Sequence, residues 1–100
     1  MAYCRALIPV HGETAPADLL QPLLQAYGLD VLQPSQRTLM AYERPCAGRP
    51  IRDYVRLWAD WSDLAQTGEI WLETLSGESM ARSHTRCSAL LEQISAALRR

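Results

Sequence analysis

The chain contains no lysine and no phenylalanine, and only three of its residues are cysteine. No apolar run approaches the ~18 residues that a membrane-spanning helix needs, which excludes that class of protein. The first ten residues also lack the long apolar region and the cleavage site of a secretory signal. Cys4, Cys46 and Cys87 lie too far apart for a secreted disulfide framework, so we expect reduced thiols and a cytoplasmic protein.

Length and composition indicate a single compact domain over residues 1–100. Hydrophobic residues make up 48% of the chain and charged residues 21%, which is typical of a globular protein and too apolar for a disordered one. Alanine and leucine together number 28, whereas valine, isoleucine and threonine number 12. Because alanine and leucine favour helices and β-branched residues favour strands, we expect a helix-rich fold.

Charge is almost balanced overall but unevenly distributed. The net charge is −1, and all ten basic residues are arginine. Residues 60–78 carry five acids and no base, whereas residues 79–100 carry four arginines and one glutamate. The acidic stretch would repel a phosphate backbone, so this pattern favours a protein partner and argues against nucleic acid.

The first half of the chain predicts a strand followed by a helix. Residues 2–10 alternate, with Cys4, Ala6, Ile8 and Val10 on one side and Tyr3, Arg5 and Leu7 on the other, as in a half-buried strand. Leucines at helical spacing then predict a helix that Thr14 caps and that Gly28 follows. Pro22 should kink this helix or move its start to Gln21.

The middle of the chain allows more than one interpretation. Residues 37–42 fit a strand, but residues 35–44 also fit a helix capped by Ser35. Pro50 suits the first position of a helix that Gly68 would end. The apolar face of that helix would consist of Ile51, Tyr54, Val55, Trp58, Trp61, Leu64 and Ala65. Residues 69–75 lie between Gly68 and Gly77, and their side chains would point alternately to two faces, which predicts a strand.

The end of the chain predicts a long helix capped by Ser79. Its apolar seam has a period of 3.5 residues and consists of Met80, His84, Cys87, Leu91, Ile94 and Leu98. The expected fold is therefore α/β or α+β, helix-rich, in the order β-α-(β/α)-α-β-α. Three to four helices would pack on a small parallel or mixed sheet of two to three strands, with an all-α fold as the alternative.

Two surface features suggest binding sites. The first is a loop just before the helix predicted from Pro50, with three arginines in or beside it: Arg44, Arg49 and Arg52. Their guanidinium groups and the free N–H groups of the helix start could hold a phosphate or a carboxylate. The alternative is a solvated loop. A set of aromatic residues could pack in the core or serve as interface anchors: Tyr54, Trp58, Trp61 and Trp71.

Candidates for catalysis are incomplete. The segment Gly77-Glu-Ser-Met-Ala81, preceded far upstream by His11-Gly12, resembles the nucleophile elbow of the α/β-hydrolases. That resemblance implies Ser79 as nucleophile, but the acid and histidine of a triad normally follow in later strands. Here one predicted helix follows Ser79, and His84 lies on that helix only five residues beyond it. His84 and Cys87 are three residues apart and could present two metal ligands, with Cys4 or His11 needed to complete the set. We expect neither a metal nor a cofactor.

The predicted last helix carries more apolar surface than one small sheet would cover, which favours a homodimer through it. The residues of that surface would be Met80, His84, Cys87, Leu90, Leu91, Ile94 and Leu98, with one of the two adjacent leucines facing the partner. The sequence thus favours a small non-catalytic module (an adaptor, inhibitor, immunity or regulatory protein) that binds a protein partner. The alternatives are a phosphate- or RNA-binding protein that uses the arginine loop, and a truncated hydrolase-like unit that uses Ser79.

Overall fold

Five antiparallel strands form a single sheet in the computed structural model, which describes residues 1–32, 34–81 and 84–99. The elements follow the order β1 (Ala2–Pro9), α1 (Pro16–Ala26), β2 (Leu29–Leu32), β3 (Thr38–Glu43), the 3-10 turn η1 (Ile51–Asp53), β4 (Arg56–Asp60), α2 (Leu64–Thr67), β5 (Glu69–Ser76) and α3 (Arg86–Leu98). The strand order across the sheet is β1-β5-β4-β3-β2.

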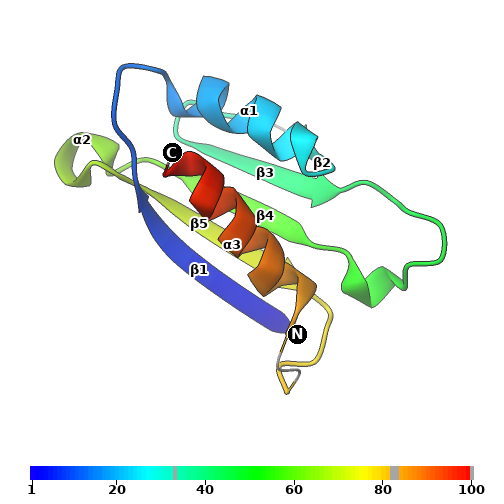
Figure 1. Cartoon of the computed structure of the whole chain (residues 1–100). Coiled ribbons are helices and arrows are strands. Elements are labelled where there is room, and N and C mark those ends of the chain that lie inside the picture. Colours follow the sequence, from blue (N-terminus) through cyan, green and yellow to red (C-terminus); the bar gives the residue numbers. More distant parts are fainter. Residues whose placement is uncertain (33, 82–83, 100) are drawn as a thin grey trace.

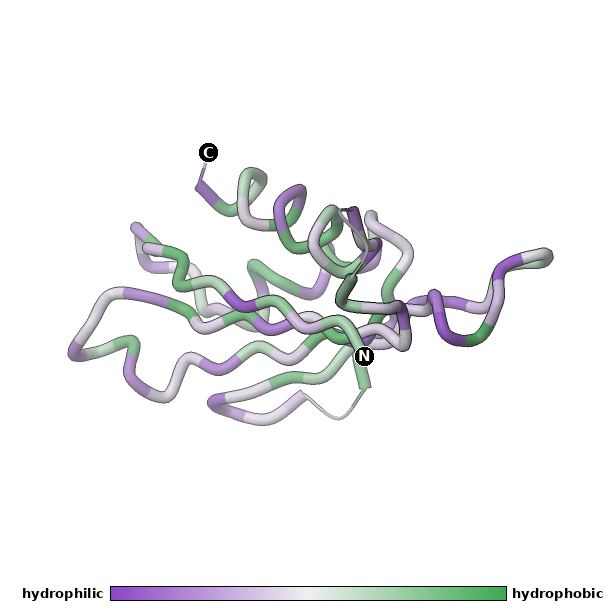
Figure 2. The backbone as a smooth tube through the Cα atoms, turned by 90° about the horizontal axis from the view of Figure 1, so that it is seen from below, coloured by the Kyte–Doolittle hydropathy of each residue, from purple (hydrophilic) through white to green (hydrophobic). Residues whose placement is uncertain are grey.

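The two longer helices among the described residues cover the same face of this sheet. Strands β2 to β5 follow one another as antiparallel neighbours, and β1 joins the sheet beside β5, with Ala2 opposite Ser76 and Pro9 opposite Glu69. Helix α1 packs against β2 and α3 packs against β1 and β5, so the two helices lie on the same side (Figure 1). Figure 2 shows both helices above the sheet and no helix of comparable length below it.

The core lies between the two helices and the sheet face that they cover. Alternate strand residues point into it, so the burial pattern of β5 alternates without interruption from Glu69 to Ser76. Ile8 and Ile70 are paired across β1 and β5, and both are completely buried. The helices contribute Leu20, Leu24, Leu90, Leu91 and Ile94 to the same cluster.

The expected fold class is wrong in its sheet and in its helix content. The sheet has five strands, all antiparallel, where two or three parallel or mixed strands were expected, and the all-α alternative is wrong as well. The main error is the helix predicted from Pro50 to the residue before Gly68, a segment that instead contains η1, β4 and α2. Val55, Leu57 and Ala59 are all buried with Trp61, so every second residue points into the core. That period of two identifies a strand.

The other predicted strands agree with the structure. β1 and β5 occupy the segments predicted from alternation, and the open choice over residues 35–44 is settled as the strand β3. Helix α1 begins at Pro16 after Ala15, so neither the Thr14 cap nor a start at Gln21 is correct. Pro22 lies inside the helix, and Gly28 follows it with a φ of 84°, a conformation that favours glycine.

Helix α3 begins later than the apolar seam predicted. Its first residue is Arg86, and the side chain of Thr85 accepts a hydrogen bond from the Ser88 N–H, so Thr85 and not Ser79 is the cap. Met80 and His84 precede the helix and are exposed. With 13 residues α3 is the longest described helix, and no helix in the described segments is long and apolar enough to cross a membrane.

A partly buried ion pair fixes the start of α3 to the end of β3. Both guanidinium Nη atoms of Arg86 donate to the carboxylate of Glu43, whose side chain is only 7% exposed. Glu43 also accepts from Arg49 Nη1 at 2.9 Å and from the Val55 N–H at 3.0 Å. Burial alone would raise the pKa of Glu43, but the hydrogen bonds of Arg86 and Val55 and the charges of Arg86 and Arg49 lower it below its ordinary value.

We predict that Glu43→Gln lowers the free energy of unfolding at pH 7 by about 2–4 kcal/mol, because it leaves Arg86 without its buried partner. The control Asp30→Asn removes the exposed Asp30–Arg44 pair and should cost less than about 1 kcal/mol. Urea denaturation at several pH values measures both.

Because the folded pKa of Glu43 is lowered, its stabilisation is present above the ordinary glutamate pKa and is lost as the pH falls through the folded value. The difference between the wild type and Glu43→Gln should therefore shrink below about pH 4. A difference that is independent of pH would contradict the prediction.

Candidate functional site

The uncovered face of the sheet, which we call the outer face, carries an ordered set of aromatic, apolar and charged side chains. The strand register aligns one row across all five strands: Arg5, Glu73, Trp58, Met40 and Leu32. A second row consists of Leu7, Trp71, Asp60 and Thr38, and a third of Tyr3, Leu75, Arg56, Tyr42 and Asp30.

This face is unusually apolar for a sheet face that no helix covers. The solvent face of an antiparallel sheet is ordinarily polar. Here Leu7 is 50% exposed and lies in the row of the half-buried Trp71, and Leu32 is 48% exposed and lies in the row of the half-buried Trp58. Tyr3 in the third row is 41% exposed. Apolar and aromatic side chains that remain exposed on one face, with charged residues among them, are characteristic of an interaction surface.

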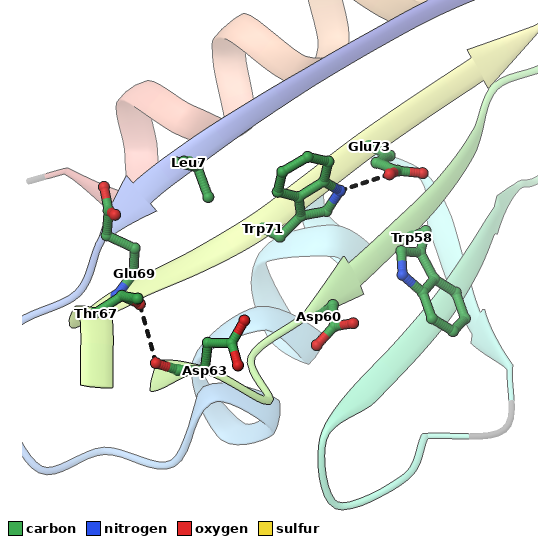
Figure 3. A pocket seen from close by; sticks show the side chains of 8 residues that line it. All are labelled: Leu7, Trp58, Asp60, Asp63, Thr67, Glu69, Trp71 and Glu73. Carbon is green, nitrogen blue, oxygen red and sulfur yellow. Dashed lines mark hydrogen bonds between the residues drawn. The ribbon is translucent and has the colours of Figure 1, made fainter. Parts of the chain in front are cut away.

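A pocket of about 460 Å³ opens on the outer face between β5, β4 and the α2 turn (Figure 3). Its walls include the two indole rings of Trp58 and Trp71 and the side chain of Leu7. The other lining residues are Thr67 and four acids: Asp60, Asp63, Glu69 and Glu73. None of the eight lining residues is basic, so the pocket combines aromatic walls with negative charge.

Hydrogen bonds hold the walls of the pocket in place. Trp71 Nε1 donates to Glu73 Oε1 at 2.6 Å, and Thr67 Oγ1 donates to the Asp63 carbonyl at 3.0 Å (Figure 3). Asp60 accepts from both the N–H and the hydroxyl of Ser62. At the edge of the pocket, desolvation and the Glu73 carboxylate raise the pKa of Tyr3, so its phenol stays neutral.

A cation of the chain itself lies against one of the two indole rings. The Arg5 guanidinium lies over the Trp71 ring, 5.4 Å from the ring centroid, in the geometry of a cation–π contact. The described residues contain no group of three or more His, Cys, Asp and Glu side chains placed to hold a metal ion. Indole rings beside carboxylates match the chemistry of a guanidinium or an alkylammonium group.

The structure brings together two of the four aromatic residues predicted as interface anchors. Trp58 and Trp71 both lie on the outer face and line its pocket. Trp61 is 8% exposed and its Nε1 donates to the Gln36 carbonyl, so it belongs to the core. The Tyr54 hydroxyl contacts the backbone of Cys46 in the loop before η1.

The arginine loop has a different structure from the one predicted. Only the single turn η1 follows it, so the expected long helix does not supply N–H groups there. Arg44 pairs with Asp30 at 3.1 Å, Arg49 with Glu43 at 2.9 Å, and Arg52 lies 3.8 Å from its neighbour Asp53. The three arginines thus face carboxylates of the chain itself, which weakens the case for an anion site.

The residues expected to form a dimer are mostly part of the core. Leu90 and Leu91 are 8% and 6% exposed, so both pack against the sheet of their own chain. Cys87 and Ile94 are completely buried, and Leu98 packs against the same cluster. The spare leucine surface that suggested a homodimer is therefore occupied, and the homodimer stays a prediction.

The residues considered for catalysis do not form a nucleophile elbow, and those considered for metal binding are not arranged as predicted, although Cys4 Sγ lies 3.9 Å from Cys87 Sγ. Ser79 is exposed and lies between β5 and α3, and its hydroxyl accepts from the Ala81 N–H. The helix expected at Ser79 begins at Arg86, so Ser79 does not occupy the sharp strand-to-helix turn of a nucleophile elbow. His84 is exposed before α3 whereas Cys87 is buried within it, so the two do not share a helix face.

The sequence did not predict most of the residues that β2, β3 and β4 contribute to the outer face. Met40 and Asp60 are examples, because one lay in the undecided segment and the other in the wrongly predicted helix. The available signal was alternation: Leu39 and Ala41 point inward around Met40, as Leu57 and Ala59 do around Trp58. The acidic character of residues 60–78 was visible, and three of the pocket acids besides Asp60 come from that stretch.

Comparisons of the chain with protein-family models, with curated proteins and with solved structures found no match.

Proposed function

We propose that this protein is a non-catalytic interaction module that binds a basic segment of another protein on the outer face of its sheet. The observation that carries the proposal is the pocket in which Trp58 and Trp71 stand among four carboxylates. Tryptophan supplies large contact area at interfaces, and the acids select a partner of opposite charge.

The chemistry of the partner follows from the pocket walls. An arginine or lysine side chain of the partner would lie against an indole ring, as Arg5 does on Trp71 within the chain. Its charged end would reach Asp60, Asp63 or Glu69. Leu7, Met40 and Leu75 offer apolar surface to the residues that flank this side chain.

Nucleic acid fits the outer face less well. An open antiparallel sheet with aromatic residues can stack RNA bases, but such surfaces also attract the phosphates with basic residues. Here Arg5 already covers Trp71, and the pocket acids would repel a phosphate backbone. Within this proposal the protein acts as an adaptor, inhibitor, immunity or regulatory protein, and its three free thiols suit the reducing cytoplasm.

Truncation of the aromatic walls tests the proposal. We expect Trp58→Ala to weaken binding of a fluorescein-labelled peptide of alternating arginine and glycine by about tenfold, the effect of losing an interface anchor. The control Tyr27→Ala removes an exposed aromatic residue from the end of α1 and should leave the affinity unchanged. Fluorescence anisotropy measures both, and circular dichroism checks the folds. Equal affinities for the two variants would contradict binding at the outer face.

Neutralisation of the pocket acids tests the charge argument. We expect the double variant Asp63→Asn with Glu69→Gln to weaken binding of the same peptide about fivefold, because it removes two charges that attract the arginines. The affinity should also depend less on salt concentration, since salt screens that attraction. The matched control Glu13→Gln with Asp18→Asn removes two exposed acids outside the pocket and should have little effect. A labelled single-stranded RNA is titrated in parallel. Tighter binding of the RNA than of the peptide would overturn the proposal in favour of nucleic acid.

A further inference from the structure

Two cysteines far apart in sequence meet between β1 and α3, on the face opposite the proposed binding surface. Cys4 lies on the inner side of β1, and Cys87 lies in the first turn of α3. Their Sγ atoms are 3.9 Å apart although 83 positions separate them in the chain. The Thr85 hydroxyl lies 3.3 Å from Cys87 Sγ and helps to hold that sulfur in place.

The two thiols differ in their access to solvent. Cys87 is completely buried, whereas Cys4 is half-buried and lines a groove of about 290 Å³ between β1 and α3. Ser88, Leu91 and Glu92 form the α3 side of that groove. A small molecule can therefore approach Cys4 first, and Cys87 is placed behind it.

We infer that Cys4 and Cys87 are a modification site, a thiol pair that a low-molecular-weight disulfide converts into an intramolecular disulfide. In the first step the Cys4 thiolate attacks one sulfur of glutathione disulfide, forms a mixed disulfide and releases one glutathione thiolate. In the second step the Cys87 thiolate attacks Cys4 Sγ and releases the other glutathione. The protein loses two protons and two electrons, and one glutathione disulfide becomes two glutathione thiols.

The geometry makes the second step short. A disulfide has an S–S length of about 2.05 Å, so the two sulfurs must approach by about 2 Å from their observed separation of 3.9 Å. Burial and the neighbouring Cys87 raise the pKa of Cys4, which makes the first step slow at neutral pH and keeps the reduced form persistent. The bond would join the first strand to the last helix and so constrain nearly the whole unfolded chain.

Oxidation of the full chain tests this inference. The Cys46→Ser variant is used because the substitution removes the exposed third thiol from the reaction. It is incubated for hours with glutathione disulfide at pH 8.5. We expect the intact mass to fall by about 2 Da, the loss of two hydrogens, with no glutathione attached. The melting temperature should rise on the order of 10 °C, and a reducing agent should reverse the shift.

Two further variants in the same background assign the roles of the sulfurs. Cys87→Ala should keep one glutathione on Cys4, because no second thiol can displace it, whereas Cys4→Ala should stay unmodified since Cys87 is buried. If the parent variant retains a bound glutathione, or stays reduced while an unfolded sample of it oxidises, the inference is overturned. These outcomes do not depend on the peptide-binding surface, so they leave the proposed function untouched.

Discussion

A five-stranded sheet has two faces, and the two longer described helices of this chain both lie on the same one. That one-sided cover determines the rest of the molecule. On the covered face, alternate residues of every strand form a dry core with the leucines of α1 and α3. On the other face, the intervening residues remain at the surface whatever their polarity. Two tryptophans and several large aliphatic side chains lie there, and burial within the chain does not account for them.

The position of α3 depends on a few buried polar contacts at one end of the sheet. Glu43 occupies an inward position of β3, where its carboxylate would be costly without partners. Arg86 at the start of α3 neutralises it, and the Val55 N–H completes its hydrogen bonds. Glu78, just after β5, is 1% exposed and accepts a hydrogen bond from the Arg86 N–H. This bond links the end of β5 to the start of α3. These contacts direct α3 across β1 and β5, where Cys87 comes to lie beside Cys4.

The outer face and the thiol pair are chemically different and lie on opposite sides of β1. Tyr3, Arg5 and Leu7 point to the outer face, and Cys4 points toward α3. Because successive residues of a strand face opposite ways, one strand can contribute to a binding surface and to a covalent link without conflict. The proposed recognition of a cation at Trp71 and the inferred thiol chemistry at Cys4 would thus be independent of each other.

The sequence alone determined those features that depend on local alternation or composition. These are the strands β1 and β5 with the side to which each residue points, the helix α1, the final helix except for its start, and the acidic character of residues 60–78. It did not determine β4, because Tyr54, Val55, Trp58 and Trp61 also fit a helical period. The burial of Leu57 and Ala59, which lie off that helical face, distinguishes the two. Glu43 reads as an ordinary surface acid until α3 supplies Arg86 from 43 positions away. Tertiary structure alone decided which strand lies beside which, and therefore which side chains share the outer face. Pairing between distant segments depends on the packing of the whole core, to which no local pattern has access.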